Sequence, residues 1–275
     1  MAIYTCLDMI ADCRAGKPEG WRYLVTYYVP VIRWILAHYA AERASDSRLL
    51  ERLLGILKNS DHPLFAMPHT SEREFVAALR QEIVSRLEDQ AGQQELPASF
   101  SFEILSVALK PLTAMERQMV WLEGMQWGVE ASAKMLNLES RTIAAARQRA
   151  DELLRAHLDH WSQGWMGKNG RALARAVQAV PSEQCFEAHA FLDAIDGRIT
   201  WNRKKDLDFH LLSCWRCVDH FCRMREVDFA FRETRPLTDA EASAFFQLLQ
   251  IPTAPKKLGW MARLFSRGAE RSPLN

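Results

Sequence analysis

The sequence predicts an all-α protein made of several small domains. Apolar residues recur at helical spacing along most of the chain, alternating strand patterns are nearly absent, and two stretches without periodicity divide the chain. The 275 residues, 48% of them hydrophobic, suffice to bury a sizeable core, and this length favours two or three small domains over one. We therefore expect a multi-domain helical protein, most of which is ordered.

The charge balance and the cysteines limit the functional class. With 35 Lys and Arg against 34 Asp and Glu, the net charge is +1, so a nucleic-acid contact must be local or assisted by a partner. Six cysteines without a signal-peptide pattern favour a reducing compartment and metal-binding thiols. The most apolar stretch, residues 24–40, is interrupted by Pro30, Arg33 and His38. We expect a cytoplasmic protein without a membrane partner.

Residues 1–95 are expected to form the first helical domain. Apolar stripes at three- and four-residue spacing mark its helices, as in Leu24, Tyr28, Val31 and Ile35. The domain also carries arginines that either face a macromolecular partner or form a solvated helix face: Arg33, Arg48, Arg52, Arg73 and Arg80. Periodicity is lost over residues 90–101, which predicts a linker.

Residues 104–160 carry the pattern of a helix-turn-helix. Thr113 followed by Glu116 forms a capping box that predicts a helix start, and the helix should end near Gly124, a residue that tolerates the left-handed cap conformation. A short apolar stripe from Val129 ends at Asn137, which allows a tight turn. The stretch 140–154 then reads as a longer recognition helix.

This stretch resembles region 4 of the extracytoplasmic-function sigma factors. Glu116, Arg117 and Met119 match the family's first helix, and Thr142-Ile143 with Arg149-Ala150 match its recognition helix. The resemblance implies contact with the −35 promoter element and with RNA polymerase core. The candidate DNA-binding residues are Arg141, Thr142, Arg147 and Arg149.

The recognition helix has few basic residues. Ala144, Ala145 and Ala146 stand where the family usually supplies several cations, and residues 104–158 carry seven Lys and Arg against six Asp and Glu. Fewer phosphate contacts release fewer counterions, which weakens autonomous DNA binding. A generic three-helix bundle remains the alternative interpretation.

Residues 18–90 resemble sigma region 2 in length, helical spacing and position. The resemblance implies binding to the polymerase clamp and melting of the −10 element. Residues 46–57, DSRLLERLLGIL, depart from the family's acidic signature, so the domain resembles a degenerate region 2 and promoter melting stays an open question.

The strongest chemical signal is the pattern His210-x-x-x-Cys214-x-x-Cys217. On a helix, His and Cys four residues apart share a face, and two cysteines in Cys-x-x-Cys reach one ion. Tetrahedral zinc needs a fourth ligand. Cys185, 25 residues before His210, can supply it if a helical hairpin brings it back. The competing interpretation treats these cysteines as small buried apolar residues.

Residues 182–232 are similar to the zinc-containing anti-sigma family. The segment LDAIDGRI, with Asp196-Gly197 before the histidine, adds to the spacing of the ligand pattern. His189 rivals Cys185 as fourth ligand because family members differ at that position, and the spacing favours Cys185. The resemblance implies a small zinc-binding domain at 180–233 that binds between sigma regions 2 and 4, and in some members releases the sigma factor when the cysteines oxidise.

The remaining features complete the expected organisation. Residues 162–170, SQGWMGKNG, read as a flexible linker, and Thr238 with Glu241 caps a last helix within residues 234–275, whose basic end is expected to be flexible. No phosphate-binding loop or nucleophile elbow occurs, so we expect no enzyme. We expect a sigma-like regulator restrained in cis by its own zinc domain; the alternative is a sigma-like adaptor or anti-sigma protein that acts only through protein contacts.

Overall fold

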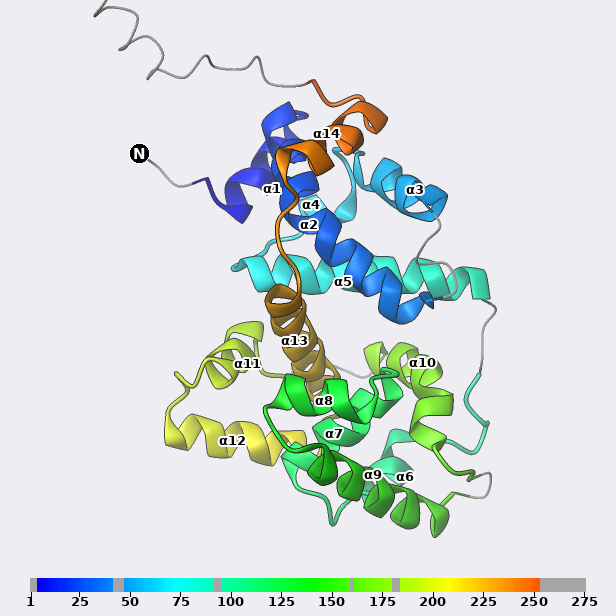
Figure 1. Ribbon diagram of the computed structural model, residues 1–275. Coiled ribbons are helices and arrows are strands. Elements are labelled where there is room, and N and C mark those ends of the chain that lie inside the picture. Colours follow the sequence, from blue (N-terminus) through cyan, green and yellow to red (C-terminus); the bar gives the residue numbers. More distant parts are fainter. Residues whose placement is uncertain (1–3, 42–46, 92–94, 159–160, 180–183, 253–275) are drawn as a thin grey trace, which may run out of the picture.

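The computed structural model describes residues 4–41, 47–91, 95–158, 161–179 and 184–252, and these ranges contain helices but no strand, which confirms the all-α prediction (Figure 1). In chain order the helices are α1 (Cys6–Arg14), α2 (Pro18–Tyr39), α3 (Ser47–Leu57), α4 (Pro63–Ala66), α5 (Glu72–Ala91), α6 (Phe102–Ala108), α7 (Ala114–Gly124), α8 (Val129–Leu136), α9 (Ser140–Arg155), α10 (Trp165–Gln178), α11 (Ala188–Ile195), α12 (Trp201–Leu211), α13 (Trp215–Glu233) and α14 (Asp239–Leu248).

Helices α1 to α5 form an N-terminal bundle around α2. The predicted stripe of α2 is its core face, since Leu24, Tyr28, Val31 and Ile35 are all almost completely buried. Helix α14 returns from the far end of the chain and packs on α2, where the backbone N–H of Leu237 donates to the carbonyl of Thr26 at 2.8 Å. The bundle thus contains segments from both ends of the described chain (Figure 1).

Helices α6 to α9 form the helix-turn-helix unit. The predicted capping box is present, because the Thr113 side chain accepts from the backbone N–H of Glu116 and the Glu116 carboxylate accepts from that of Thr113. Helix α7 ends at Gly124, but the left-handed residue that follows is Gln126, with φ of 66°. Asn137 adopts φ of 54° and makes the predicted turn between α8 and α9.

The segment predicted as a flexible linker, residues 162–170, is largely helical and that prediction is wrong. Helix α10 begins at Trp165 and crosses α7 where Gly170 meets Gly124. A Cβ on Gly170 would lie 1.6 Å from the carbonyl oxygen of Gly124, so only glycine permits this close crossing. Gly170, one of the glycines that suggested flexibility, thus serves helix packing instead.

Helix α13 lies between the two helical units. Figure 1 shows it running from beneath α2 and α5 to α7 and α8, and it contacts α5 and α2 on one side and α7, α8 and α10 on the other. Its buried residues include two carboxylates, Asp219 and Glu226, among aromatic and aliphatic side chains. The arrangement of the two units therefore depends on this helix.

Two further expectations meet the structure only in part. The C-terminal stretch expected to be a flexible end falls mostly outside the described residues, which stop at Pro252. Within the described ranges, no helix combines the length and the apolar character that crossing a bilayer requires.

Candidate metal centre

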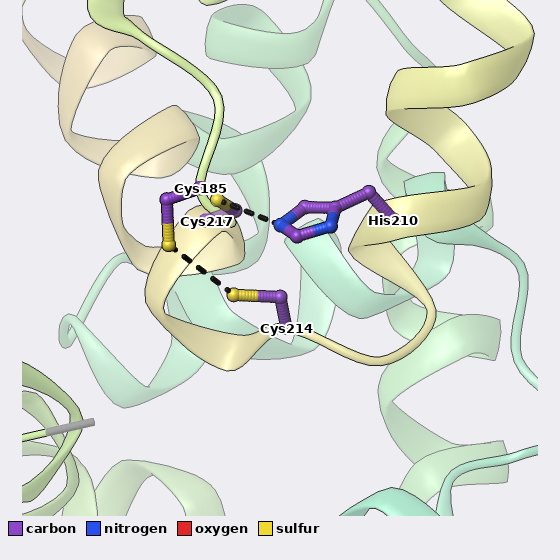
Figure 2. A group of neighbouring side chains, drawn as sticks. All are labelled: Cys185, His210, Cys214 and Cys217. Atoms are coloured by element: carbon purple, nitrogen blue, oxygen red, sulfur yellow. Dashed lines mark hydrogen bonds between the residues drawn. The ribbon is translucent and has the colours of Figure 1, made fainter. Parts of the chain in front are cut away.

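Four predicted ligands converge from three parts of the chain (Figure 2). Cys185 lies in the segment before α11, His210 in the last turn of α12, Cys214 at the cap of α13, and Cys217 in the first turn of α13. Helix α12 ends at Leu211, so a tight turn, and not a continuous helix, carries the chain from His210 to Cys214. Their ligand atoms all lie within 4.8 Å of one another.

The spacing of these atoms fits a tetrahedral metal ion. The sulfurs of Cys185 and Cys214 are 3.7 Å apart, and Nε2 of His210 is 3.1 Å from the sulfur of Cys217. A tetrahedral ion with metal–sulfur bonds of about 2.3 Å holds two sulfurs about 3.8 Å apart. The group can therefore hold a metal ion with little movement.

The cluster is partly buried. Cys217 is buried, the other three ligands are half-buried, and the ring of Phe186 packs edge-on against the His210 imidazole at 5.3 Å. Four protein ligands complete a tetrahedral shell, which is the arrangement of structural metal sites. All four positions of such a shell would be filled by protein ligands.

The thiols of the cluster differ in acidity. A hydrogen bond from the Cys217 thiol lowers the pKa of Cys214 to about 5, whereas that same contact raises the pKa of Cys217. Burial raises the pKa of Cys185. Metal binding requires thiolates, so loading of the site must release protons and become weaker as the pH falls.

The rival ligand His189 lies outside the cluster. Its side chain is 49% exposed, its Nδ1 is 3.1 Å from the Glu187 carboxylate, and its Nε2 contacts the Arg203 guanidinium. The remaining cysteines are also elsewhere: Cys6 and Cys13 are buried in α1, and Cys222 is buried in α13. Of the two rivals, the described geometry brings Cys185 to the other three ligands.

The candidate DNA-binding residues on α9 divide into two groups. Arg141 and Thr142 are exposed, although Arg141 contacts the Glu139 carboxylate, and Arg149 is half-exposed and bonded to Glu116 at 3.0 Å. The Arg147 guanidinium instead lies within the fold, where it donates to Ser132 Oγ at 2.8 Å.

The alternation of burial along α9 explains this division. The helix buries Ile143, Ala146 and Ala150 against α7 and α8 and turns Ala144 and Ala145 outward. Its outward face is therefore short of cations, as the sequence indicated.

Sequence reasoning missed the polar contacts that α13 makes with both helical units. Asp219 accepts from the Trp121 indole of α7 at 3.0 Å and from the Gln178 amide of α10 at 2.9 Å. Glu226 accepts from Arg80 of α5 at 3.0 Å, and both side chains are almost fully buried. The sequence holds these two carboxylates seven residues apart, which places them on one face of the helix, but the many other charged residues of α13 hide the pair.

The N-terminal arginines considered as partner-facing are largely occupied within the molecule. Besides Arg80, the Arg73 guanidinium bridges Asp196 at 2.7 Å and Asp228 of α13 at 3.1 Å. The Arg33 guanidinium lies 4.9 Å from the ring centre of Phe245 in α14. These side chains join segments distant in the sequence.

Comparison of the chain with protein-family models, curated proteins and solved structures found no match. The functional argument therefore rests on the geometry of the metal centre, of α9 and of α13.

Proposed function

We propose that the chain is a cytoplasmic sigma-factor-like transcription regulator whose N-terminal bundle and helix-turn-helix unit are held in a closed arrangement by its own zinc-binding segment. The observation that carries the proposal is α13, which begins at the metal centre and lies between the two units. In the closed arrangement the two units cannot separate, and we expect them to separate when they bind polymerase core and promoter DNA. Opening of the arrangement would free both units for these contacts.

The contacts of α13 support a specific, closed arrangement. Asp219 accepts a hydrogen bond from the helix-turn-helix unit, and Glu226 accepts one from the bundle. One helix therefore binds both units through buried hydrogen bonds. Trp34 of α2 stacks on Trp127, which follows α7, and Phe229 of α13 packs edge-on against both rings, with centroids 5.9 and 6.1 Å away. Buried polar pairs of this kind fix one relative orientation, because any other leaves them unsatisfied.

Zinc is the metal that fits the ligand set best. Three thiolates and one imidazole are soft and borderline donors, and tetrahedral geometry with such donors is typical of zinc. Cys185, His210, Cys214 and Cys217 would hold it. The ion would supply a rigid crosslink between the segment before α11, the end of α12 and the start of α13.

The proposal is tested on the full chain, with and without metal. Metal-free chain should bind core RNA polymerase in a pull-down at least about tenfold more tightly than zinc-loaded chain, if docking within one chain contributes an effective concentration near the millimolar range. Equal capture in both states would contradict restraint in cis.

The DNA contact should be weak and depend on few cations. We expect Arg141→Ala and Arg149→Ala each to weaken promoter binding by the metal-free chain several-fold, and each to reduce the slope of log affinity against log salt by about 1, because each removes one phosphate contact. Fluorescence anisotropy with labelled promoter DNA measures both. Arg198→Ala removes an exposed cation away from α9, with a side-chain exposure between those of Arg141 and Arg149, and is the matched control.

A second function is favoured by the sparse cations of α9. With Arg147 within the fold and Arg149 paired to Glu116, a chain that contacts polymerase or another sigma factor without DNA is the alternative. Absence of promoter binding by metal-free chain at low salt, together with capture of core polymerase, would establish this adaptor function.

Oxidation should open the closed arrangement through Cys185 and Cys214, whose sulfurs are 3.7 Å apart. Hydrogen peroxide transfers one oxygen atom to the first thiol, which becomes a sulfenic acid, and the other peroxide oxygen leaves as water. The second thiol then displaces the sulfenic hydroxyl, which leaves as a second water, and the disulfide forms. We expect one disulfide and release of one metal per chain, measured by peptide mass spectrometry and a metal-sensitive dye. Cys185→Ser should form no such disulfide, and retention of metal under peroxide would assign the centre a purely structural role.

A further inference from the structure

Trp215, the residue that directly follows the ligand Cys214, is anchored in the helix-turn-helix unit. It is 2% exposed, its ring stacks on Trp121 of α7 with centroids 5.6 Å apart, and its indole N–H donates to Ser106 of α6 at 2.9 Å. In the sequence, the ligands Cys214 and Cys217 lie on either side of it. One side chain therefore joins the metal centre to α6 and α7.

The same ring covers an arginine whose charge is poorly compensated. The Arg117 guanidinium carbon lies 5.0 Å from the centre of the Trp215 ring, and the Arg117 side chain is almost fully buried. Its Nη2 donates to the carbonyl of Leu109 at 3.0 Å, but its Nε and Nη1 have no hydrogen-bond partner among the described residues. A guanidinium carries five N–H donors, so most of its hydrogen-bonding capacity is unused here.

This covered position has an energetic cost that Trp215 alone does not offset. Moving a charged group out of water is expensive unless hydrogen bonds or an opposite charge replace its hydration, and a cation–π contact replaces only part of it. Withdrawal of Trp215 would let water reach Arg117. The position over Arg117 therefore needs support from elsewhere in the structure.

The metal centre is placed to give that support. Cys214 caps α13 and Cys217 lies in its first turn, so one ion bound by both thiolates fixes the backbone on each side of Trp215. Cys214 also contacts Cys185, and Cys217 contacts His210, through side-chain hydrogen bonds, which constrain the turn less than metal–sulfur bonds would.

We propose that Trp215 and Arg117 form the element through which metal occupancy controls the helix-turn-helix unit: the bound metal holds Trp215 over Arg117, and metal loss lets Trp215 withdraw because Arg117 gains hydration. This inference rests on the metal binding proposed above. It does not depend on DNA or polymerase binding. Two packings of one segment, biased by a ligand, are a recognised switching device.

Two substitutions should each favour one state, either the state with Trp215 held over Arg117 or the state with Trp215 withdrawn. Trp215→Ala removes the cover and should leave the helix-turn-helix unit open even with metal bound. Arg117→Met replaces the guanidinium with a shorter, uncharged side chain and should keep Trp215 in place after metal removal. Trp201→Ala, an exposed tryptophan of α12, is the matched control.

The experiment is hydrogen exchange of backbone amides in α6 and α7, measured by mass spectrometry on full-length chain with one equivalent of zinc or with a chelator, alongside metal content. For the wild type and Trp201→Ala, we expect chelation to speed exchange in α7 at least about tenfold. In Trp215→Ala, exchange should be fast in both conditions while one metal remains bound. In Arg117→Met, chelation should change exchange less than about threefold.

The outcomes separate this inference from the proposed function. If zinc-loaded wild type shows no metal-dependent exchange in α7, or if Arg117→Met responds to chelation as the wild type does, the inference is wrong although the metal site stands. A wild type that binds no metal overturns both. Should Trp215→Ala fail to fold, Trp215→Phe is the second variant, because it keeps an aromatic ring but loses the hydrogen bond to Ser106. Chelation should then change exchange in α7 by an amount between those of the wild type and Trp215→Ala. A change equal to that of the wild type would contradict the coupling.

Discussion

Replacing both Cys214 and Cys217 by serine is expected to reduce bound metal from one per chain to none and to destabilise the segment from Cys185 through α13. Two of four ligands are lost at once, and the remaining Cys185 and His210 cannot complete a tetrahedral site. Metal analysis of purified chain by mass spectrometry measures the first effect. Thermal unfolding, with and without added zinc, measures the second.

The size of the thermal effect follows from linkage. A ligand present at a thousand times its Kd adds about 4 kcal/mol to the free energy of unfolding. For a chain of this size, about 1 kcal/mol corresponds to about 2–4 °C, so the loss of metal should lower the Tm by about 8–16 °C. The zinc-free wild type should unfold near the temperature of the double variant.

The matched control for this prediction is Cys222→Ser. Cys222 lies in the same helix, is fully buried, and donates to the carbonyl of Gln118 rather than to the ligand group. It should retain one metal per chain. A double variant at Cys214 and Cys217 that retains full metal content would disprove the site.

The second large effect is expected at the contact between α13 and the N-terminal bundle. Glu226→Gln leaves the Arg80 guanidinium buried against a neutral amide, and breaking a buried ion pair from one side costs about 3–5 kcal/mol. Burial raises the pKa of the Glu226 carboxyl while the Arg80 charge opposes this rise, so the pair depends on both partners being present. Chemical denaturation with urea measures the loss.

Two comparisons show whether that loss comes from the unpaired charge. Asp208→Asn breaks the exposed Lys204–Asp208 pair on α12 and should cost less than about 1 kcal/mol, since exposed pairs contribute little. The double variant Arg80→Met with Glu226→Met should be less destabilised than the sum of the two single variants. Additive losses would show that Arg80 and Glu226 act independently.

These two sites lie at opposite parts of one helix. The metal ligands fix the start of α13, Asp219 follows two residues after Cys217, and Glu226 lies two turns further on. Removal of the metal therefore acts on the start of α13, where Asp219 contacts the helix-turn-helix unit, whereas loss of Glu226 acts on the contact with Arg80 of the bundle. The proposed closed arrangement predicts that either change increases polymerase capture.

The sequence by itself determined the features that depend on local patterns. Helical periodicity predicted the all-α class, the Thr113–Glu116 pair predicted a helix start, and Asn137 predicted a turn, because each reflects contacts within a few residues. The spacing of His210, Cys214 and Cys217 predicted ligands for one ion for the same reason. Cys185 was chosen over His189 without a local contact to decide between them, and the fold brings Cys185 to the group.

Only the tertiary structure decided the features that depend on pairs far apart in the chain. From the sequence, Gly170 looks like part of a linker, but in the fold it contacts Gly124 where two helices cross. Arg80 likewise looks like a surface cation, but it pairs with Glu226 in the core. A residue's burial depends on which element packs against it, and a single sequence does not state that pairing. The position of α13 between the two units, on which the proposed function depends, is set by such long-range packing.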